Sequence, residues 1–217
     1  MTRVSDAVKT PPAGRARSTY RQEQAQATRD RISAAARRLF ATDGYRMTTM
    51  TAIAREAGVA DRTVYSAFGA KREILSAICE QWLEDAHARE LVGAAVAATG
   101  ERETVALAAR FLRSLFETGY DVMQLFDAAM AEDPETRALL RAKLDGRNQV
   151  MALIVDSIQD RLTVPLPVAQ AVYRALAAVG VYQELVVESG WSIDEYERWL
   201  VAELGRQWLG GPAGSPA

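Results

Sequence analysis

The stretch from Thr48 to Lys71 constrains the fold of this chain more than any other part of its sequence. It holds two short helical patterns with Gly58 between them. Glycine adopts a positive φ without steric cost, so it can end a helix abruptly. Two short helices joined by a tight turn form a helix-turn-helix, whose second helix enters the major groove of DNA. The stretch therefore predicts a DNA-reading element.

The periodicity of both helices supports this interpretation. Apolar residues of the first helix fall at the spacing of one helix face, and they are Met50, Ile53, Ala54 and Ala57. Val64 and Phe68 do the same in the second helix. Its outer face carries side chains that can hydrogen-bond phosphates or base edges, namely Arg62, Thr63, Tyr65 and Ser66. We expect this outer face to meet DNA.

The residues around the motif resemble the DNA-binding domain of the TetR (tetracycline-repressor-like) family of bacterial regulators. The matching segments are RRLFATDGY, TTM, IAREAGV, TVY and KREIL, together with Phe68. They lie between Arg29 and Leu75, a run of 47 of the 217 residues. The resemblance implies an all-α protein of about nine helices. An N-terminal three-helix DNA-binding domain would precede a helical bundle for ligand binding and dimerisation.

The resemblance and the changes of composition predict four segments. They are a disordered basic tail (1–20), a helix-turn-helix DNA-binding domain (21–70), a helical effector-binding and dimerisation domain (71–209) and a second disordered tail (210–217). The first helix is expected to run from about Gln22 to Ala41. The N-terminal tail has two interpretations, an inert leader or an arm that lays Arg15, Arg17 and Arg21 on DNA.

The resemblance also assigns DNA contacts outside the second helix. Thr48 or Thr49 is expected to cap the helix that follows, and in the family this helix start also lies against a phosphate. Lys71 stands where the family places a lysine on the DNA backbone, and a basic residue at a helix start opposes the dipole. The full set of predicted contacts is Thr48, Thr49, Asp61, Arg62, Thr63, Tyr65, Ser66 and Lys71.

The second helix departs from the family pattern at its two ends. Family members carry Ser or Thr where Ala60 stands, and His or Tyr where Ala67 stands. Alanine can neither cap a helix nor donate to a phosphate. Asp61 either takes over the cap or lies in the first turn, where the helix dipole favours it. Its carboxylate could accept from a cytosine amino group, so we expect an unusual half-site preference or weaker binding.

The charge distribution separates the two ends of the chain. The net charge of −2 would argue against a nucleic-acid binder if it were read alone. Residues 1–75, however, hold 14 Lys and Arg against 7 Asp and Glu, which leaves 12 basic and 21 acidic residues for the remainder. A basic end joined to an acidic body is typical of a chain with one nucleic-acid-facing end.

Cysteine usage and hydropathy bear on location. Cys79 is the only cysteine, so an internal disulfide is excluded and the chain suits a reducing compartment. Its position on an apolar helix face is typical of core, with redox sensing as the alternative. Neither a signal-peptide core nor an apolar run of membrane-spanning length is present in the sequence. We expect a soluble cytoplasmic protein that associates with the nucleoid when bound to DNA.

The body from about residue 102 onwards has helical periodicity and no strand alternation. Methionine and aromatic side chains there suit an adaptable apolar ligand, although such residues are more often ordinary core. Arg147 falls on an apolar stripe, where it needs either an internal partner (Asp121, Asp127 or Glu117), a route to the edge, or an anionic or carbonyl group of a ligand. The candidate effector pocket is Phe111, Leu115, Met123, Phe126, Met130, Arg147 and Tyr173.

The last two helical patterns predict an association surface. Residues 168–187 include only two charged residues, Arg174 and Glu184, and a helix that is apolar all round must be buried all round. Ser192 and Glu195 form a capping box for the final helix. In the family, the last two helices of each subunit pair into a four-helix dimer interface. The predicted interface residues are Val172, Leu176, Val179, Tyr196, Leu200 and Leu204.

The sequence thus favours a homodimeric regulator, most simply a repressor released from a near-palindromic operator by a small apolar effector. An enzyme is disfavoured because the chain has one histidine, His87, one cysteine and no glycine-rich phosphate loop. No catalytic residue, metal site or cofactor is predicted. A helical protein-interaction module with weak or no specific DNA binding is the alternative, kept open by Ala60 and Ala67.

Overall fold

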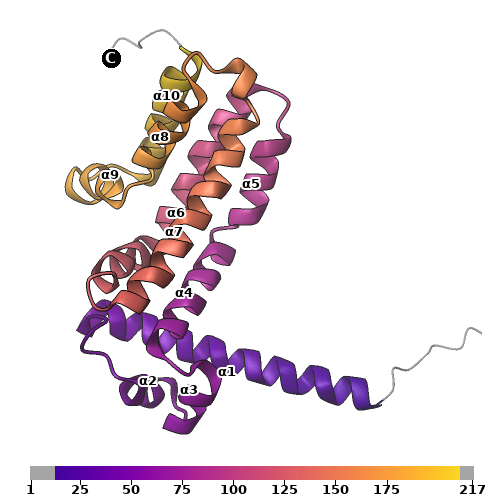
Figure 1. The fold of residues 1–217 in the computed structure, drawn as a ribbon, viewed down its shortest axis with the longest axis vertical. Coiled ribbons are helices and arrows are strands. Elements are labelled where there is room, and N and C mark those ends of the chain that lie inside the picture. The colour runs from indigo at the N-terminus through magenta and orange to yellow at the C-terminus, as the bar shows by residue number, and fades with distance from the viewer. Residues whose placement is uncertain (1–12, 211–217) are drawn as a thin grey trace, which may run out of the picture.

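The computed structural model describes residues 13–210, and every regular element in that range is helical (Figure 1). The helices are, in chain order, α1 (Ala13–Asp43), α2 (Met50–Ala57), α3 (Asp61–Phe68), α4 (Lys71–Asp85), α5 (Ala88–Ala97), α6 (Glu101–Ala129), α7 (Pro134–Asp156), α8 (Leu166–Leu176), α9 (Val179–Tyr182) and α10 (Ile193–Leu209). A 3-10 turn, η1 (Gln159–Arg161), precedes α8, and a π-helical segment, η2 (Gln183–Glu188), continues α9. The all-α prediction is confirmed. None of these helices combines the length and apolar character needed to cross a bilayer.

The first helix is longer than expected. α1 begins at Ala13 rather than near Gln22, so residues 13–20 of the expected tail belong to a helix. It lies across the base of the molecule, with α2 and α3 beneath it and the other helices rising above it as a bundle (Figure 1). Residues 1–12 and 211–217 lie outside the described range, and the tail predictions for them fall there.

Local capping explains where several helices begin and end. Thr49 Oγ1 accepts a hydrogen bond from the Ala52 N–H at 3.1 Å, which caps α2. Gly58 ends α2 with a φ of 65°, a left-handed conformation that glycine adopts without steric cost. Asp133 caps α7 ahead of Pro134, and Ser192 forms the predicted capping box at the start of α10.

The apolar core of the molecule extends into the base, where α1, α2, α3 and α4 meet. Its fully or nearly fully buried residues include Ile32, Phe40, Tyr45, Ile53, Val64, Phe68 and Ile74. Arg29 of α1 donates to the Ala67 carbonyl and lies 4.1 Å from the centre of the Phe68 ring. Arg29 thereby holds the end of α3 against α1, so the angle of α3 is fixed by more than apolar packing.

α6 consists of two helical stretches that meet at a kink at Gly119, where φ is −155° and ψ is 32°. The sequence predicted a helix that closes at this glycine and a short helix after it. The kink disturbs the ladder of backbone hydrogen bonds, and side chains bind two nearby carbonyls. The indole N–H of Trp82 donates to the Leu115 carbonyl at 2.9 Å, and Arg37 donates to the Thr118 carbonyl at 3.0 Å.

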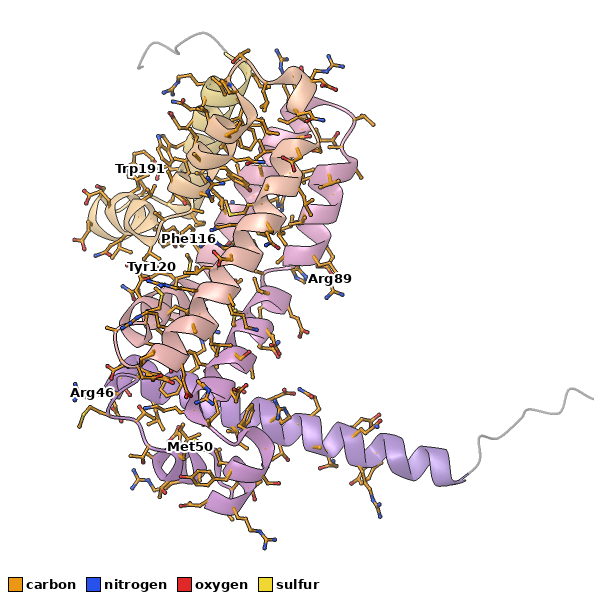
Figure 2. The ribbon with its side chains drawn as sticks, in the orientation of Figure 1. Arg46, Met50, Arg89, Phe116, Tyr120 and Trp191 are labelled. Carbon is orange, nitrogen blue, oxygen red and sulfur yellow. The ribbon has the colours of Figure 1, made fainter. Side chains whose placement is uncertain are left out.

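The predicted single helix over 168–187 is broken in the structure. Ala178 has extended backbone, so α8 ends before it and α9 begins after it. The break lets Tyr182 stack on Phe116, with ring centroids 4.7 Å apart, beside Tyr120. Phe116 and Tyr120 both come from α6 (Figure 2). Aromatic packing against α6 therefore decides the course of this segment.

The inner face of α10 packs on the chain's own core. Tyr196, Leu200 and Leu204 are 0% exposed within one chain. They were predicted to form the dimer interface, and that part of the prediction was wrong because α10 covers α6 with this face. Periodicity identified an apolar face but could not tell whether the same chain or a partner covers it.

Candidate DNA-reading face and effector cavity

The outer face of α3 is open to solvent. Asp61, Arg62, Tyr65 and Ser66 are exposed, and Thr63 is half-buried. Val64 and Phe68 fill the core on the opposite side, so the buried pair fixes which side chains point outward. Tyr65 is 53% exposed, a large fraction for an aromatic side chain on a helix of the base. The predicted DNA-facing residues of α3 thus share one accessible surface.

Of the two threonines before α2, only Thr49 is accessible. Thr48 is 3% exposed, and its hydroxyl donates to the Gly44 carbonyl at 2.9 Å. This burial removes Thr48 from the DNA-facing surface, which corrects the prediction made for it. Thr49 is exposed and caps α2. The sequence alone could not separate two adjacent threonines that both suit a helix start.

Asp61 lies in the first turn of α3, and Ala60 occupies the cap position without a side-chain hydrogen bond. Of the two placements considered for Asp61, the first-turn position is the observed one. Its carboxylate accepts from the Thr51 hydroxyl at 2.7 Å, and this bond joins α3 to α2.

Lys71 begins α4, as predicted, but its ammonium group is used inside the protein. Nζ donates to the carbonyls of Tyr45, Arg46 and Thr48 at 2.5, 3.3 and 3.1 Å. Burial lowers the pKa of this amine, and the nearby acids Glu132 and Asp133 oppose that effect. A lysine has three donors, so a phosphate contact would require it to leave a carbonyl. The phosphate contact of Lys71 stays a prediction.

A large cavity of about 1110 Å³ lies in the body. Its walls come from α4, α5, α6, α7 and the junction of α8 and α9. The apolar lining residues include Cys79, Trp82, Leu83, Val92, Phe111, Met123, Phe126, Val150 and Val179. A volume of this size slightly exceeds the roughly 300–1,000 Å³ that is usual for small-molecule sites. The chain therefore has room for a drug-sized or larger apolar ligand.

Four of the seven predicted pocket residues line this cavity, and they are Phe111, Met123, Phe126 and Arg147. The other three lie elsewhere. Leu115 is core, Met130 packs at the end of α6, and Tyr173 is fully buried with its hydroxyl donating to the Ala108 carbonyl at 2.8 Å. The walls from α4, α5 and residues 177–180 were missed because only tertiary packing brings these segments together.

Arg147 faces the cavity from α7 with unmet hydrogen-bonding capacity. Its Nε is buried and has no partner among the described residues, and one terminal nitrogen donates to Asn148 at 3.3 Å. Burial lowers the pKa of the guanidinium, while the charge of Asp127 raises it. Of the acids proposed as internal partners, Asp121 binds Arg37 and Glu117 binds Arg113. Within residues 13–210, Arg147 forms no ion pair.

The kinked end of α6 connects the cavity to the base. Met123, Phe126 and Asp127 line the cavity. In the same segment, the Asp121 carboxylate accepts two hydrogen bonds from Arg37 of α1, at 2.6 and 2.7 Å. A second contact joins Arg72, at the start of α4, to Glu135 of α7 at 2.6 Å. One short helical segment thus touches both the cavity and the DNA-binding domain.

The Arg37–Asp121 pair predicts a stability effect that depends on pH. Burial pushes the pKa of the Asp121 carboxyl upward, but the hydrogen bonds and charge of Arg37 outweigh burial, and the pKa falls below 3.8. A carboxyl with a depressed pKa stabilises the fold above its unfolded pKa and loses that contribution as pH falls through the folded value. Asp121→Asn should therefore lower the free energy of unfolding at pH 7, and by progressively less as the pH falls below 3.8.

Urea unfolding of the wild type and the variant between pH 7 and pH 3 measures this difference. Asp145→Asn, at an exposed site on α7, is the matched control and should show no such trend. A difference between Asp121→Asn and the wild type that stays constant over this pH range would contradict the prediction.

Comparison with known proteins agrees with this architecture. Residues 32–78 match the family described as bacterial regulatory proteins, tetR family. The match runs from α1 through α2 and α3 into α4, which is the DNA-binding base. No curated protein matches the chain in sequence.

Solved structures share the fold at low sequence identity. NalD, the secondary repressor of the MexAB-OprM multidrug efflux pump in Pseudomonas aeruginosa, has a TM-score of 0.67 and 20% identity, covering 86% of this chain and 98% of that one. The fatty acid degradation regulator FadR from Bacillus halodurans has a TM-score of 0.68 and 18% identity, with coverage of 87% and 97%. FadR from Bacillus subtilis, in complex with stearoyl-CoA, has a TM-score of 0.65 and 19% identity, with coverage of 80% and 96%.

At identities this low, the comparison establishes a shared fold, and the ligand named for one protein is not carried over to another. The family match over the base identifies the DNA-binding end, and the structural likeness extends the common architecture through the body. Residues 32–78 are thus a DNA-binding domain of the family described as bacterial regulatory proteins, tetR family, and the chain as a whole has the fold of the solved regulators.

Proposed function

We propose that the chain is a homodimeric transcriptional repressor that leaves its operator when a small, largely apolar effector fills the cavity. The observation that carries this proposal is the α6 segment after Gly119, which lines the cavity with Met123 and Phe126 and holds α1 through Asp121. An effector that contacts this segment would favour one position of the DNA-binding domain over another. Repression and release would take place in the cytoplasm, where operator DNA is found.

The proposed DNA contacts are Thr49, Arg62, Thr63, Tyr65 and Ser66, with Asp61 influencing base preference. Each subunit would place its α3 in the major groove of one half-site. The two copies of α3 would then lie about one helical turn (~34–36 Å) or a multiple apart. The cytosine contact of Asp61 competes with its bond to the Thr51 hydroxyl, so we expect its effect on half-site preference to be moderate.

The proposed dimer surface is the outer face of α8 and α10. Val168 is 47% exposed, and Val172 and Leu176 follow it at one-turn spacing on α8. On α10, Val201, Gly205 and Leu209 are half-buried at the same spacing, beside the face that covers α6. Small and apolar residues at these positions suit close pairing of helices from two subunits.

A band shift with the full chain and DNA upstream of its own gene tests the proposal. Retardation is expected, with affinity falling steeply between about 50 and 200 mM salt as phosphate contacts weaken. Arg62→Ala should weaken binding at least about tenfold, whereas Arg198→Ala, an exposed arginine of α10, should not. Asp61→Ala should change the ranking of operator variants.

A helical protein-interaction module is the second candidate, and the uncapped start of α3 at Ala60 is the observation that favours it. The same band shift separates the two candidates. If neither the upstream region nor any sequence selected from a random pool is retarded, DNA binding is not the function of this base.

A further inference from the structure

α7 forms one wall of the cavity, and its buried residues lie only near its two ends. Thr136 and Leu140 are buried near its start, and Met151, Ile154 and Val155 are buried near its end. None of the ten residues from 141 to 150 is buried, although six of them line the cavity. Nearly three turns of α7 therefore contain no buried residue. A ligand beneath α7 would be held along its length by this helix.

The charged residues of the cavity are unevenly distributed in depth. The four acids, Glu80, Glu84, Glu90 and Asp127, are all exposed, and Figure 2 shows Arg89 pointing away from the bundle. Lys143 binds Glu80 at 2.9 Å, so its charge already has a partner. The acids thus lie at the rim, where water solvates them.

Arg147 is the exception among the charged lining residues. Its buried Nε lacks a partner, and its charge cannot be lost because a guanidinium stays protonated in proteins. An unpaired buried donor and a partly desolvated charge both cost free energy unless a partner satisfies them. An oxyanion would satisfy both at once, since the guanidinium presents two parallel donors to a carboxylate. A cation at the same place would be repelled.

We infer that the effector is an amphiphile with one anionic head group, which Arg147 binds inside the cavity while an apolar body lies beneath α7. This inference rests on the proposed function and names the chemical class of its effector. The apolar body would contact Trp82, Phe111 and Phe126, whose rings line the cavity. Met123 and Phe126, of the α6 segment that also holds α1, would form part of the wall around the bound molecule.

Three probes with the same chain and different head groups test the inference. They are dodecanoate, dodecanol and dodecylammonium, each titrated calorimetrically into the DNA-free full chain below its micelle concentration. Dodecanoate should bind about tenfold or more tighter than dodecanol, because a hydrogen bond to a charged group exceeds a neutral one. Dodecylammonium should bind most weakly.

Two substitutions assign the head-group preference to one side chain. Arg147→Met keeps an apolar stem without the charge, and it should bring dodecanoate and dodecanol to within about threefold of each other. Arg147→Lys should restore part of the preference. Arg141→Met, an exposed site of the same helix outside the cavity lining, is the matched control and should retain the wild-type preference.

Several results would overturn the inference. These are dodecanol or dodecylammonium binding as tightly as dodecanoate, a preference that survives Arg147→Met, or no binding by any of the three probes. Failure of the proposed function is distinguishable. Dodecanoate that binds through Arg147 but leaves the operator band shift unchanged would sustain the inference and contradict effector-controlled release.

Discussion

Gly119→Ala should lower the free energy of unfolding by about 2–5 kcal/mol, because overpacking and a lost buried hydrogen bond both contribute. A Cβ at this position would lie 2.0 Å from Trp82 Nε1 and 2.2 Å from its Cδ1. The indole cannot move aside freely, since Trp82 is 4% exposed and Nε1 donates to the Leu115 carbonyl. Chemical denaturation at neutral pH measures the loss.

Gly93→Ala is the control for this substitution. Gly93 is a glycine of α5 with nothing within 4 Å of an added Cβ, so alanine there should stabilise the helix by about 0.5–1 kcal/mol. A loss for Gly119→Ala no larger than about 1 kcal/mol would mean that the indole accommodates the methyl group. Trp82→Phe in the Gly119→Ala background should recover part of the packing cost and leave the lost hydrogen bond.

Gly205→Arg should separate the proposed dimer without unfolding either subunit. An added Cβ at Gly205 meets nothing within 4 Å in a single chain, so the monomer has room for the larger side chain. On the proposed interface, however, Gly205 lies between Val201 and Leu209, where an arginine would hold the partner helix away. Light scattering after size exclusion should show a monomer. Operator affinity should fall by about a hundredfold or more, because a monomer binds only one half-site.

Gly93→Arg makes the same change at an exposed helical glycine of α5 and should leave both the oligomeric state and operator binding unaltered. A Gly205→Arg protein that remains a dimer with full operator affinity would place the partner elsewhere on the surface. Circular dichroism of both variants, compared with the wild type, verifies that each subunit stays folded.

Much of the base could be predicted from the sequence because its determinants are local. A capping threonine, a glycine with positive φ and apolar residues at helical spacing all act within a few positions, as at Thr49 and Gly58. Thr48 shows the limit of this reasoning. Its neighbour caps a helix, and only the folded loop, where the Thr48 hydroxyl donates to the Gly44 carbonyl, buries the Thr48 side chain.

The body was harder to predict because periodicity gives a helix an apolar face but not its partner. Tyr196 and Leu200 face α6 of the same chain rather than a second subunit. Arg147 was recognised as an arginine on an apolar stripe, and that signal did locate one wall of the cavity. Trp82 and Gly180 come from distant parts of the chain, and no local sequence pattern indicates that they line the same cavity.

The kinked end of α6 also bears on how such a regulator can change over evolution. Met123 and Phe126 belong to the same short segment as Asp121, so a substitution that reshapes this wall also disturbs the helix that supports the DNA-binding domain. Leu83 on α4, Val92 on α5 and Val150 on α7 also line the cavity, but they lie outside the segment that holds α1. New effector preferences should therefore arise first on these walls, while the segment after Gly119 changes slowly.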